Sequence, residues 1–340
     1  MNIVVLAGGL SPERDVSLSS GSMVANALIS NGHNVILLDL YKGLENTDNF
    51  KDAFDRYKKK EYSHITPQKE PDLEKLIFEN GNRKEWLGEN IINICKTADV
   101  TFLALHGAMG ENGELQSVLN SCNIKYTGSD PLGSAIAMNK QISKEIFSFH
   151  KILTPPWKIY DLNSNEHFIP KLPCVIKPIS GGSSIGLSLA ETKSDFDKAL
   201  KYGFKYEDKL LVEERIIGRE LTVGVLDNKA LEVAEIIPKK SIFDYESKYQ
   251  DNLADEICPA KINSNLKTKL QNLSLKVHEI LHLGDYSRID FIENKNGIYC
   301  LEANILPGMT PTSVFPKSAI SVGISYNDLC EKIARLALEK

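Results

Sequence analysis

The chain has few cysteines, no excess of basic residues and no long apolar run, and each absence excludes a class of protein. Its six cysteines are scattered over 340 residues, without a C-x-x-C pair or a Cys/His cluster at zinc-binding spacing. The formal net charge of -5 disfavours general nucleic-acid binding. The first residues, M-N-I-V-V-L-A-G-G, lack the cationic start and long apolar core of a signal peptide. We therefore expect a cytoplasmic globular protein with reduced thiols that contacts neither membrane nor nucleic acid.

Two common nucleotide-binding patterns are also missing. The sequence has no G-x-x-x-x-G-K-[ST], and the glycines at residues 8 and 9 do not begin a G-x-G-x-x-G. Instead, K-P-I-S-G-G-S-S-I-G at residues 177–186 follows an apolar run and places the lysine before the glycines. Taken alone, this stretch fits a flexible solvent loop as well as a loop that cradles phosphates.

The order of apolar segments predicts two kinds of sheet. Apolar strands at residues 2–7, 34–39 and 100–105 alternate with helical segments such as 16–30, which is typical of a parallel sheet. The polar segment 41–86 is expected to form solvated surface helix and loop. A helix at 134–150 precedes Pro155, and the short strands that follow predict an α+β region with antiparallel sheets. These strands lie at residues 174–176, 210–213, 221–226, 232–237, 288–292 and 298–303.

The last two strands carry the strongest chemical signal. They flank a predicted turn at 293–297, and alternation places Arg288 and Asp290 on one face. Glu302 and Asn304 share a face of the partner strand, whereas Leu301 is expected to point to the opposite side. The converging carboxylates suit a magnesium ion, although a surface salt bridge with Arg288 explains the same residues.

Several polar residues follow strands at positions where ligands often bind. Ser11 is expected to cap a helix that has Pro12 at its first position, which would place Glu13 at the carboxyl edge of the parallel sheet. His106 follows another strand and is either a satisfied buried histidine or a site residue. Glu213 and Glu220, near a strand end, could accept hydrogen bonds from adenine and ribose or could be ordinary surface charge.

Taken together, these stretches resemble the D-alanine–D-alanine ligase family of the ATP-grasp superfamily. The matching runs occur in family order across nearly the whole chain. They are G-G-L-S-P-E-R-D-V-S-L-S-S-G (8–21), A-L-H-G-A-M-G-E-N-G-E-L-Q (104–116), Y-T-G-S (126–129), M-N-K (138–140), V-I-K-P-I-S-G-G-S-S-I-G (175–186), V-E-E-R-I-I-G-R-E-L-T-V (212–223), F-D-Y-E-S-K-Y (243–249), R-I-D-F (288–291) and L-E-A-N-I-L-P-G-M-T (301–310).

The resemblance implies an α/β N-terminal domain with a Rossmann-like parallel sheet, followed by a two-part α+β ATP-grasp fold. The expected domains are residues 1–128, 129–212 and 213–340, with ATP gripped between the last two and with the chain forming a homodimer. The implied reaction is ATP-dependent ligation of two D-alanines through an acyl phosphate, for peptidoglycan precursor synthesis. A related ligase with D-serine or D-lactate as acceptor is the alternative.

The resemblance also assigns site residues. It implies that ATP is bound by Lys140, Lys177, Glu213, Glu214, Ile216, Glu220 and Lys248. It implies that two Mg²⁺ ions, for which Mn²⁺ is a possible replacement, are held by Asp290, Glu302 and Asn304. The implied catalytic residues are Glu13, Ser183, Tyr249, Arg288 and Gly308, and the implied substrate-binding residues are His106, Ser313 and Val314. Tyr249 is typical of relatives that use an amine acceptor. Ile305, Leu306 and Val314 depart from the usual family residues near the second-substrate site.

Overall fold

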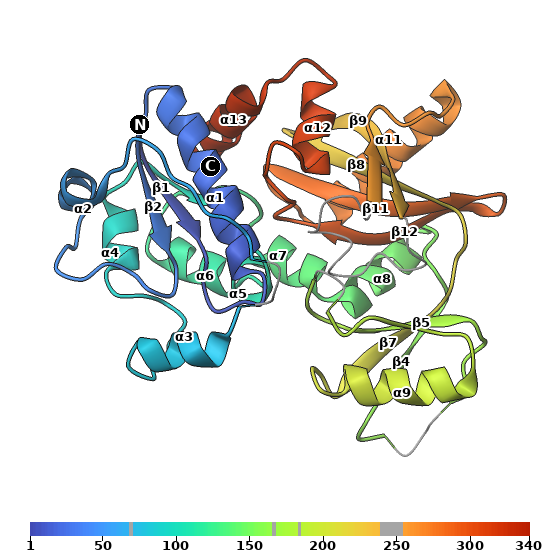
Figure 1. Cartoon of the computed structure of the whole chain (residues 1–340). Coiled ribbons are helices and arrows are strands. Elements are labelled where there is room, and N and C mark those ends of the chain that lie inside the picture. The colour runs from blue at the N-terminus through green and yellow to red at the C-terminus, as the bar shows by residue number, and fades with distance from the viewer. Residues whose placement is uncertain (68–70, 165–167, 183–184, 239–253) are drawn as a thin grey trace.

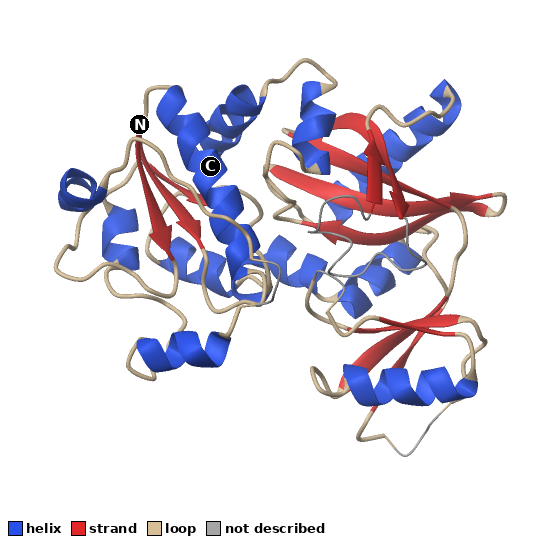
Figure 2. Ribbon diagram, in the orientation of Figure 1, coloured by secondary structure: helices blue, strands red, loops and turns tan. Residues whose placement is uncertain are grey.

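The computed structural model describes residues 1–67, 71–164, 168–182, 185–238 and 254–340 of the chain. Their strands form three sheets, arranged side by side with helices packed against each (Figure 1 and Figure 2). One sheet is parallel and belongs to the N-terminal part, and two are antiparallel. The two kinds of sheet that the sequence predicts are therefore both present.

The N-terminal sheet has the strand order β2-β1-β3, with β1 at Asn2–Ala7, β2 at Asn34–Asp39 and β3 at Val100–Leu103. Its strands are almost continuously apolar because helices cover both faces of a parallel sheet. Helix α1 (Arg14–Ser30) packs closely against β1, where a side chain at Gly21 would collide with Ala7. The chain leaves β1 toward β2 on one side and reaches β3 on the other. The loops after β1 and β3 therefore border the crevice in which such sheets bind ligands.

The remaining helices of this part are short, and the segment 41–86 is solvated only in part. The segment does form surface helix and loop, but Tyr41, Phe50 and Tyr62 are buried in the N-terminal core. The average composition of the segment did not predict these three buried side chains, because most of the residues around them are polar. The helices are α2 (Phe50–Tyr57), α3 (Leu73–Glu79), α4 (Ile91–Lys96), α5 (Ala108–Glu111) and α6 (Glu114–Ser121).

A four-stranded antiparallel sheet with the order β4-β7-β5-β6 forms the central part. Helix α9 (Lys193–Gly203) packs on it through Phe196, Ala199 and Leu200, and a Thr192 capping box fixes the start of that helix. The strands are β4 (Trp157–Asp161), β5 (Cys174–Pro178), β6 (Ser188–Ala190) and β7 (Lys209–Glu214).

A five-stranded antiparallel sheet with the order β10-β9-β8-β11-β12 forms the C-terminal part. Helices α11 (Ser264–Ile280) and α12 (Val314–Ile320) cover it, as Figure 1 shows. The strands are β8 (Arg219–Leu226), β9 (Lys229–Pro238), β10 (Ala254–Ile257), β11 (Tyr286–Asn294) and β12 (Gly297–Asn304).

The predicted helix at 134–150 is two helices, α7 (Pro131–Met138) and α8 (Lys140–Phe149). Asn139 breaks the pattern because its backbone is extended and its side chain caps α8 by accepting from the Ile142 N–H at 3.0 Å. The break turns α8 so that Lys140 begins a new helix beside the glycine-rich loop.

The last helix, α13 (Tyr326–Leu338), returns to pack on α1 and β3, so that both ends of the chain share one core. His33, after α1, contacts the Glu331 carboxylate of α13 at 2.5 Å. All six cysteines are free thiols, as expected. Among the described residues, no helix combines the length and the apolar character needed to cross a membrane.

Candidate active site

Two adjoining cavities, of about 250 and 140 Å³, lie where the three sheets meet. The first is bordered by the central and C-terminal sheets, and the second extends from it to the loops of the N-terminal sheet. Residues that line both cavities mark the passage between them. These are Lys140, Gly181, Gly182, Ile236, Arg288 and Glu302.

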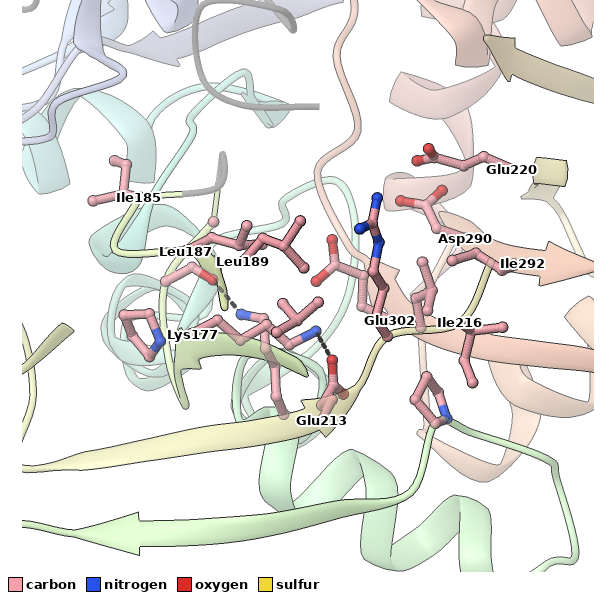
Figure 3. A pocket seen from close by; sticks show the side chains of 18 of the residues that line it. Lys177, Ile185, Leu187, Leu189, Glu213, Ile216, Glu220, Asp290, Ile292 and Glu302 are labelled. Atoms are coloured by element: carbon pink, nitrogen blue, oxygen red, sulfur yellow. Dashed lines mark hydrogen bonds and ion pairs between the residues drawn. The ribbon is translucent and has the colours of Figure 1, made fainter. Parts of the chain in front are cut away.

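Strand side chains build the polar floor of the first cavity. Lys177 on β5 and Glu213 on β7 lie diagonally across adjacent strands, and the Lys177 Nζ is 2.8 Å from the Glu213 carboxylate (Figure 3). Both side chains are at least nine-tenths buried. The lysine of the K-P-I-S-G-G stretch is thus a buried cation at a cavity wall, and not part of a solvent loop.

A second lysine, which the sequence analysis did not assign, lies behind this floor and pairs with Glu213. Lys144 on α8 is fully buried, with its Nζ 2.5 Å from the other Glu213 oxygen and 2.5 Å from the Thr154 hydroxyl. Burial lowers the pKa of Lys144, although Glu213 opposes that effect. Its position four residues after Lys140 in the helix was the signal that could have revealed it.

The three charges have an electrostatic consequence. Burial would raise the pKa of Glu213, but Lys177 and Lys144 outweigh it and lower the pKa. Burial would likewise lower the pKa of Lys177, but Glu213 and Glu302 outweigh it and raise the pKa. One carboxylate between two ammonium groups leaves this triad with a net positive charge, which favours binding of an anionic group beside Lys177.

The walls above this floor are apolar. Figure 3 shows Ile185, Leu187 and Leu189 on one side and Ile292 on the other. Leu301 joins this wall, so its expected direction is wrong. A β-bulge shifts the register after Asp290, and residues 301 and 302 both reach the cavity.

Four residues predicted to bind nucleotide line the first cavity. Glu214, Ile216 and Glu220 all line it, together with Glu213. Glu220 stands on β8 between Ile236 and Ile292, its register partners on the neighbouring strands. An apolar slot edged by carboxylates is suited to a flat heterocycle with amino and hydroxyl groups.

The hairpin of β11 and β12 brings the predicted carboxylates together. Arg288 pairs with Asn304 and Asp290 pairs with Glu302 in the strand register, as alternation predicted. The Arg288 guanidinium donates two hydrogen bonds, of 2.8 and 2.9 Å, to the Asp290 carboxylate. Asp290 also accepts from Thr222 at 2.6 Å and from the Asn304 amide at 2.9 Å.

This donor set fits a magnesium ion that also takes phosphate oxygens. Two carboxylates and an amide offer hard oxygen ligands at the passage between the cavities. Among the described residues, no group of three His, Cys, Asp or Glu side chains forms a metal site. A cation here would therefore depend on Asn304 and on ligand oxygens.

The second cavity joins the loops that follow β1 and β3. Glu13 and His106 both line it and are buried. A side chain at Gly107 would overlap the Ser11 hydroxyl, so this glycine permits the close approach of the two loops. Helix α1 begins at Arg14 and not at Pro12, while Ser11 accepts from the Glu13 N–H at 3.1 Å. Glu13 lines the second cavity, with its carboxylate close to Gly107 and Gly182.

His106 is buried but not fully satisfied. Its Nε2 has no hydrogen-bond partner among the described residues. Burial lowers the pKa of His106, Arg288 lowers it further, and Glu13 opposes both. A neutral imidazole with an unpaired ring nitrogen at a cavity wall favours the site interpretation over the purely structural one.

Glu111, which was not assigned from the sequence, also lines the second cavity. Its carboxyl accepts from the Gly107 N–H at 2.7 Å. Burial and the nearby Glu13 carboxylate raise the pKa of Glu111 to about 8. Its place five residues after His106, in the same strand-following run, was the available signal.

The far wall of the second cavity contains Gly308, Ser313 and Val314. Ser313 stands at the N-cap of α12, and its hydroxyl is 2.7 Å from that of Thr310. The structure therefore brings the predicted substrate residues of this segment into one cavity with Glu13 and His106.

The base of the glycine-rich loop separates the two cavities. The Lys140 N–H donates to the Ile179 carbonyl at 2.9 Å, and the Lys140 Nζ donates to the Gly181 carbonyl at 2.5 Å. Ser183, Lys248 and Tyr249, to which the sequence gave roles, lie outside the described residues.

The chain matches two family models over nearly its whole length. Residues 2–129 match the model described as D-ala D-ala ligase N-terminus, and residues 146–335 match the one described as D-ala D-ala ligase C-terminus. The chain belongs to the D-alanine–D-alanine ligase family. The resemblance inferred from the motifs is confirmed.

Individual members of the family are similar over their full lengths. The D-alanine–D-alanine ligase of Pediococcus pentosaceus is 40% identical and is matched over 98% of this chain and 96% of its own length. That of Lacticaseibacillus casei is 37% identical over 97% of this chain and 93% of its own length.

Solved structures of the family have the same fold. The D-alanine–D-alanine ligase from Bacillus anthracis complexed with ATP superimposes with a TM-score of 0.75 at 27% identity. The match covers 99% of this chain and 97% of that one. The expected fold class, a parallel-sheet α/β domain followed by an ATP-grasp fold, is confirmed.

Proposed function

We propose that this protein ligates two D-alanine molecules into D-alanyl-D-alanine at the expense of ATP, for the synthesis of peptidoglycan precursors. The observation that carries the proposal is the pair of adjoining cavities that meet at Lys140, Arg288 and Glu302. One cavity suits a nucleotide and the other suits a small zwitterion. The reaction must transfer a phosphoryl group across the passage between them.

In the first cavity, the base and ribose of ATP lie against the apolar walls and meet Glu213, Glu220 and the backbone of Glu214 and Ile216. The phosphates point toward Lys140 and Lys177. The Glu213 carboxylate is already compensated by Lys144, so the charge of Lys177 is available to the phosphate oxygens. We assign Lys248 to the nucleotide as well, from family resemblance.

Mg²⁺, for which Mn²⁺ is a possible replacement, would be held by Asp290, Glu302 and Asn304. When bound, it neutralises charge on the phosphate oxygens. Arg288 holds both Asp290 oxygens in this structure. Thr222 and Asn304 also donate to these oxygens, so a cation at Asp290 has to displace at least one of the donors. Displacement of the guanidinium would leave Arg288 able to turn toward the substrate.

The second cavity would bind both amino acids. Glu13 pairs with the ammonium group of the first D-alanine, whose carboxylate oxygen attacks the γ-phosphorus and displaces ADP. His106 borders this substrate, while Ser313 and Val314 border the second one and the Ser313 hydroxyl binds its carboxylate. We assign Ser183 and Tyr249 to a hydrogen-bonded chain with Glu13, from family resemblance.

Peptide formation follows from the acyl phosphate. The amine of the second D-alanine loses a proton and attacks the carbonyl carbon, and inorganic phosphate leaves as the amide forms. The oxyanion that develops is stabilised by Arg288 and the Gly308 N–H. A closed site matters because water would otherwise hydrolyse the acyl phosphate.

The wider setting follows from the substrates and the family. We propose that the enzyme works in the cytoplasm, where ATP is available, and that it forms a homodimer. Its domains would be residues 1–128, 129–212 and 213–340. The full-length relatives named above favour D-alanine as the acceptor, over D-serine or D-lactate.

The test is phosphate release from ATP and Mg²⁺ with D-alanine alone, and then with D-alanine plus D-serine or D-lactate. Products are identified by mass. Turnover with D-alanine alone, yielding the dipeptide, is the expected result. Turnover only with a mixed pair would overturn the acceptor assignment, and no turnover with any pair would overturn the proposed reaction.

A further inference from the structure

The base of the glycine-rich loop is hydrogen-bonded to the carboxylate of Glu207. Neither the glycine-rich motif nor the proposed reaction assigns a role to this residue. Glu207 lies in the connection between α9 and β7, far in sequence from the loop. Its carboxylate accepts from the Ile179 N–H at 2.9 Å and from the Ser180 N–H at 3.0 Å. The Ser180 hydroxyl donates to the same group.

These three donors sit directly after Pro178, where β5 ends and the loop starts. Two successive backbone N–H groups at such a point form a natural site for an anion. Here the protein fills that site with its own charge, through charge-assisted hydrogen bonds, which are stronger than neutral ones. Phosphate oxygens must therefore find donors beyond Ser180, or on the lysines.

The opposite side of the loop base is held independently. Lys140 binds the Ile179 and Gly181 carbonyls, and the Gly181 N–H points to the Met138 sulfur at 3.2 Å. The segment 179–181 is thus fixed between the α7–α8 junction and the carboxylate of Glu207. Beside it, Gly182 lies close to the Glu13 carboxylate of the second cavity.

We propose that Glu207 is a positioning residue for phosphoryl transfer, which fixes the base of the glycine-rich loop over the passage between the cavities. Glu207 itself lines neither cavity and acts through Ile179 and Ser180, of which Ser180 lines the first cavity. The inference rests on the proposed ligase reaction. Without this anchor the loop base moves, nucleotide binding weakens, and water reaches the acyl phosphate.

That failure has a defined chemical signature. Water attacks the carbonyl carbon or the phosphorus of the acyl phosphate, and the products are D-alanine and inorganic phosphate. The cycle then releases phosphate without making dipeptide. In a coupled cycle, phosphate and dipeptide appear in equal amounts.

The first test compares Glu207→Gln with Asp208→Asn. Glutamine keeps the size of the side chain but offers one acceptor oxygen, and its amide N–H groups face the loop donors. Asp208 is the next residue, is exposed, and loses the same charge in its variant. We expect the KM for ATP of E207Q to rise about tenfold, close to the loss of one charge-assisted hydrogen bond, and phosphate to exceed dipeptide. We expect D208N to match the wild type and Glu207→Asp to fall in between.

A folded E207Q enzyme with unchanged KM for ATP and equal phosphate and dipeptide would overturn the inference. If E207Q does not fold, E207D and a measurement on the wild type decide. Amide hydrogen exchange should find Ile179 and Ser180 protected in the nucleotide-free enzyme. Rapid exchange at both, or a fully wild-type E207D, would show that the anchor does not operate. Failure of the wild type to turn over would instead refute the proposed function.

Discussion

The two cavities share Lys140, Arg288 and Glu302, but they are built in different ways. Strand side chains make most of the first cavity, where Lys177 and Glu213 are fixed by sheet register and by ion pairs. Loops that follow strands make most of the second, where Glu13 and His106 lie in the segments after the neighbouring strands β1 and β3 of another sheet. On the proposed assignment, a nucleotide common to many enzymes would be held by a rigid floor, and the substrates that define this enzyme would be held by adaptable loops.

The largest expected effect comes from Glu302→Gln, because Glu302 belongs to both cavities. Removing its charge should lower turnover about 100-fold or more, since charge at the transferring phosphoryl group is no longer balanced. Phosphate release measures the loss, and thermal melting checks the fold. Glu293→Gln, on the same hairpin but outside both linings, should keep its activity. Near-wild-type turnover of E302Q would contradict the metal assignment.

The Lys144→Met variant tests how much the buried ion pairs at the floor of the first cavity contribute to stability. This change leaves the buried Glu213 with one cation in place of two, and should destabilise the protein by about 3 kcal/mol in denaturant unfolding. It should also raise the KM for ATP, because Lys177 is then engaged in neutralising Glu213. Lys193→Met removes an exposed pair with Asp197 on α9 and should cost less than about 1 kcal/mol. Equal stability losses in both variants would argue against the buried triad.

The second cavity predicts a pH dependence through Glu111. Its pKa is raised from 4.5 to about 8, so the native state keeps a proton that the unfolded state releases in this window. The proton therefore favours folding at low pH, and this contribution is lost as the pH rises from 4.5 toward 8. Glu111→Gln should melt like the wild type at pH 4 but about 3 °C higher or more at pH 8.5. Parallel melting curves across this range would exclude the effect.

The smallest expected effects are changes in KM for one substrate only, because each cavity is proposed to bind a different substrate. Leu301→Ala removes part of an apolar wall in the first cavity and should raise the KM for ATP about fivefold, for a loss near 1 kcal/mol. The KM for D-alanine should stay unchanged. Val314→Ala, in the second cavity, should do the reverse. A rise in both constants in either variant would mean that the two linings are not independent.

The sequence predicted the residues of a cavity well where they lie on regular strands. The hairpin residues Arg288, Asp290, Glu302 and Asn304 were placed correctly because alternation in a strand depends on local geometry alone. Leu301 was misplaced because a β-bulge inserts one residue into that alternation, and no residue type announces it. The pattern was therefore right for every position in this set except the one at the bulge.

The prediction of one helix at 134–150 was wrong at a single residue, as the strand prediction was. Asn139 looked like an interior residue of one helix, yet it caps the second of two. Asparagine is a good cap because its side chain binds backbone N–H groups. The break between the two helices is apparent only in the structure, where the Lys140 N–H donates to the Ile179 carbonyl outside the helix. Lys144 and Glu111 were missed because burial of an ionisable side chain is a tertiary property.

The sequence by itself determined the family, the kinds of sheet and the strand faces of the hairpin, because these depend on motif order and on periodicity. Only the tertiary structure decided which charges meet. It buried Lys144 and Lys177 on either side of Glu213, raised the pKa of Glu111 beside Glu13, and set Glu207 at the loop base. Those outcomes depend on distance and desolvation between residues far apart in the chain, which no local pattern records.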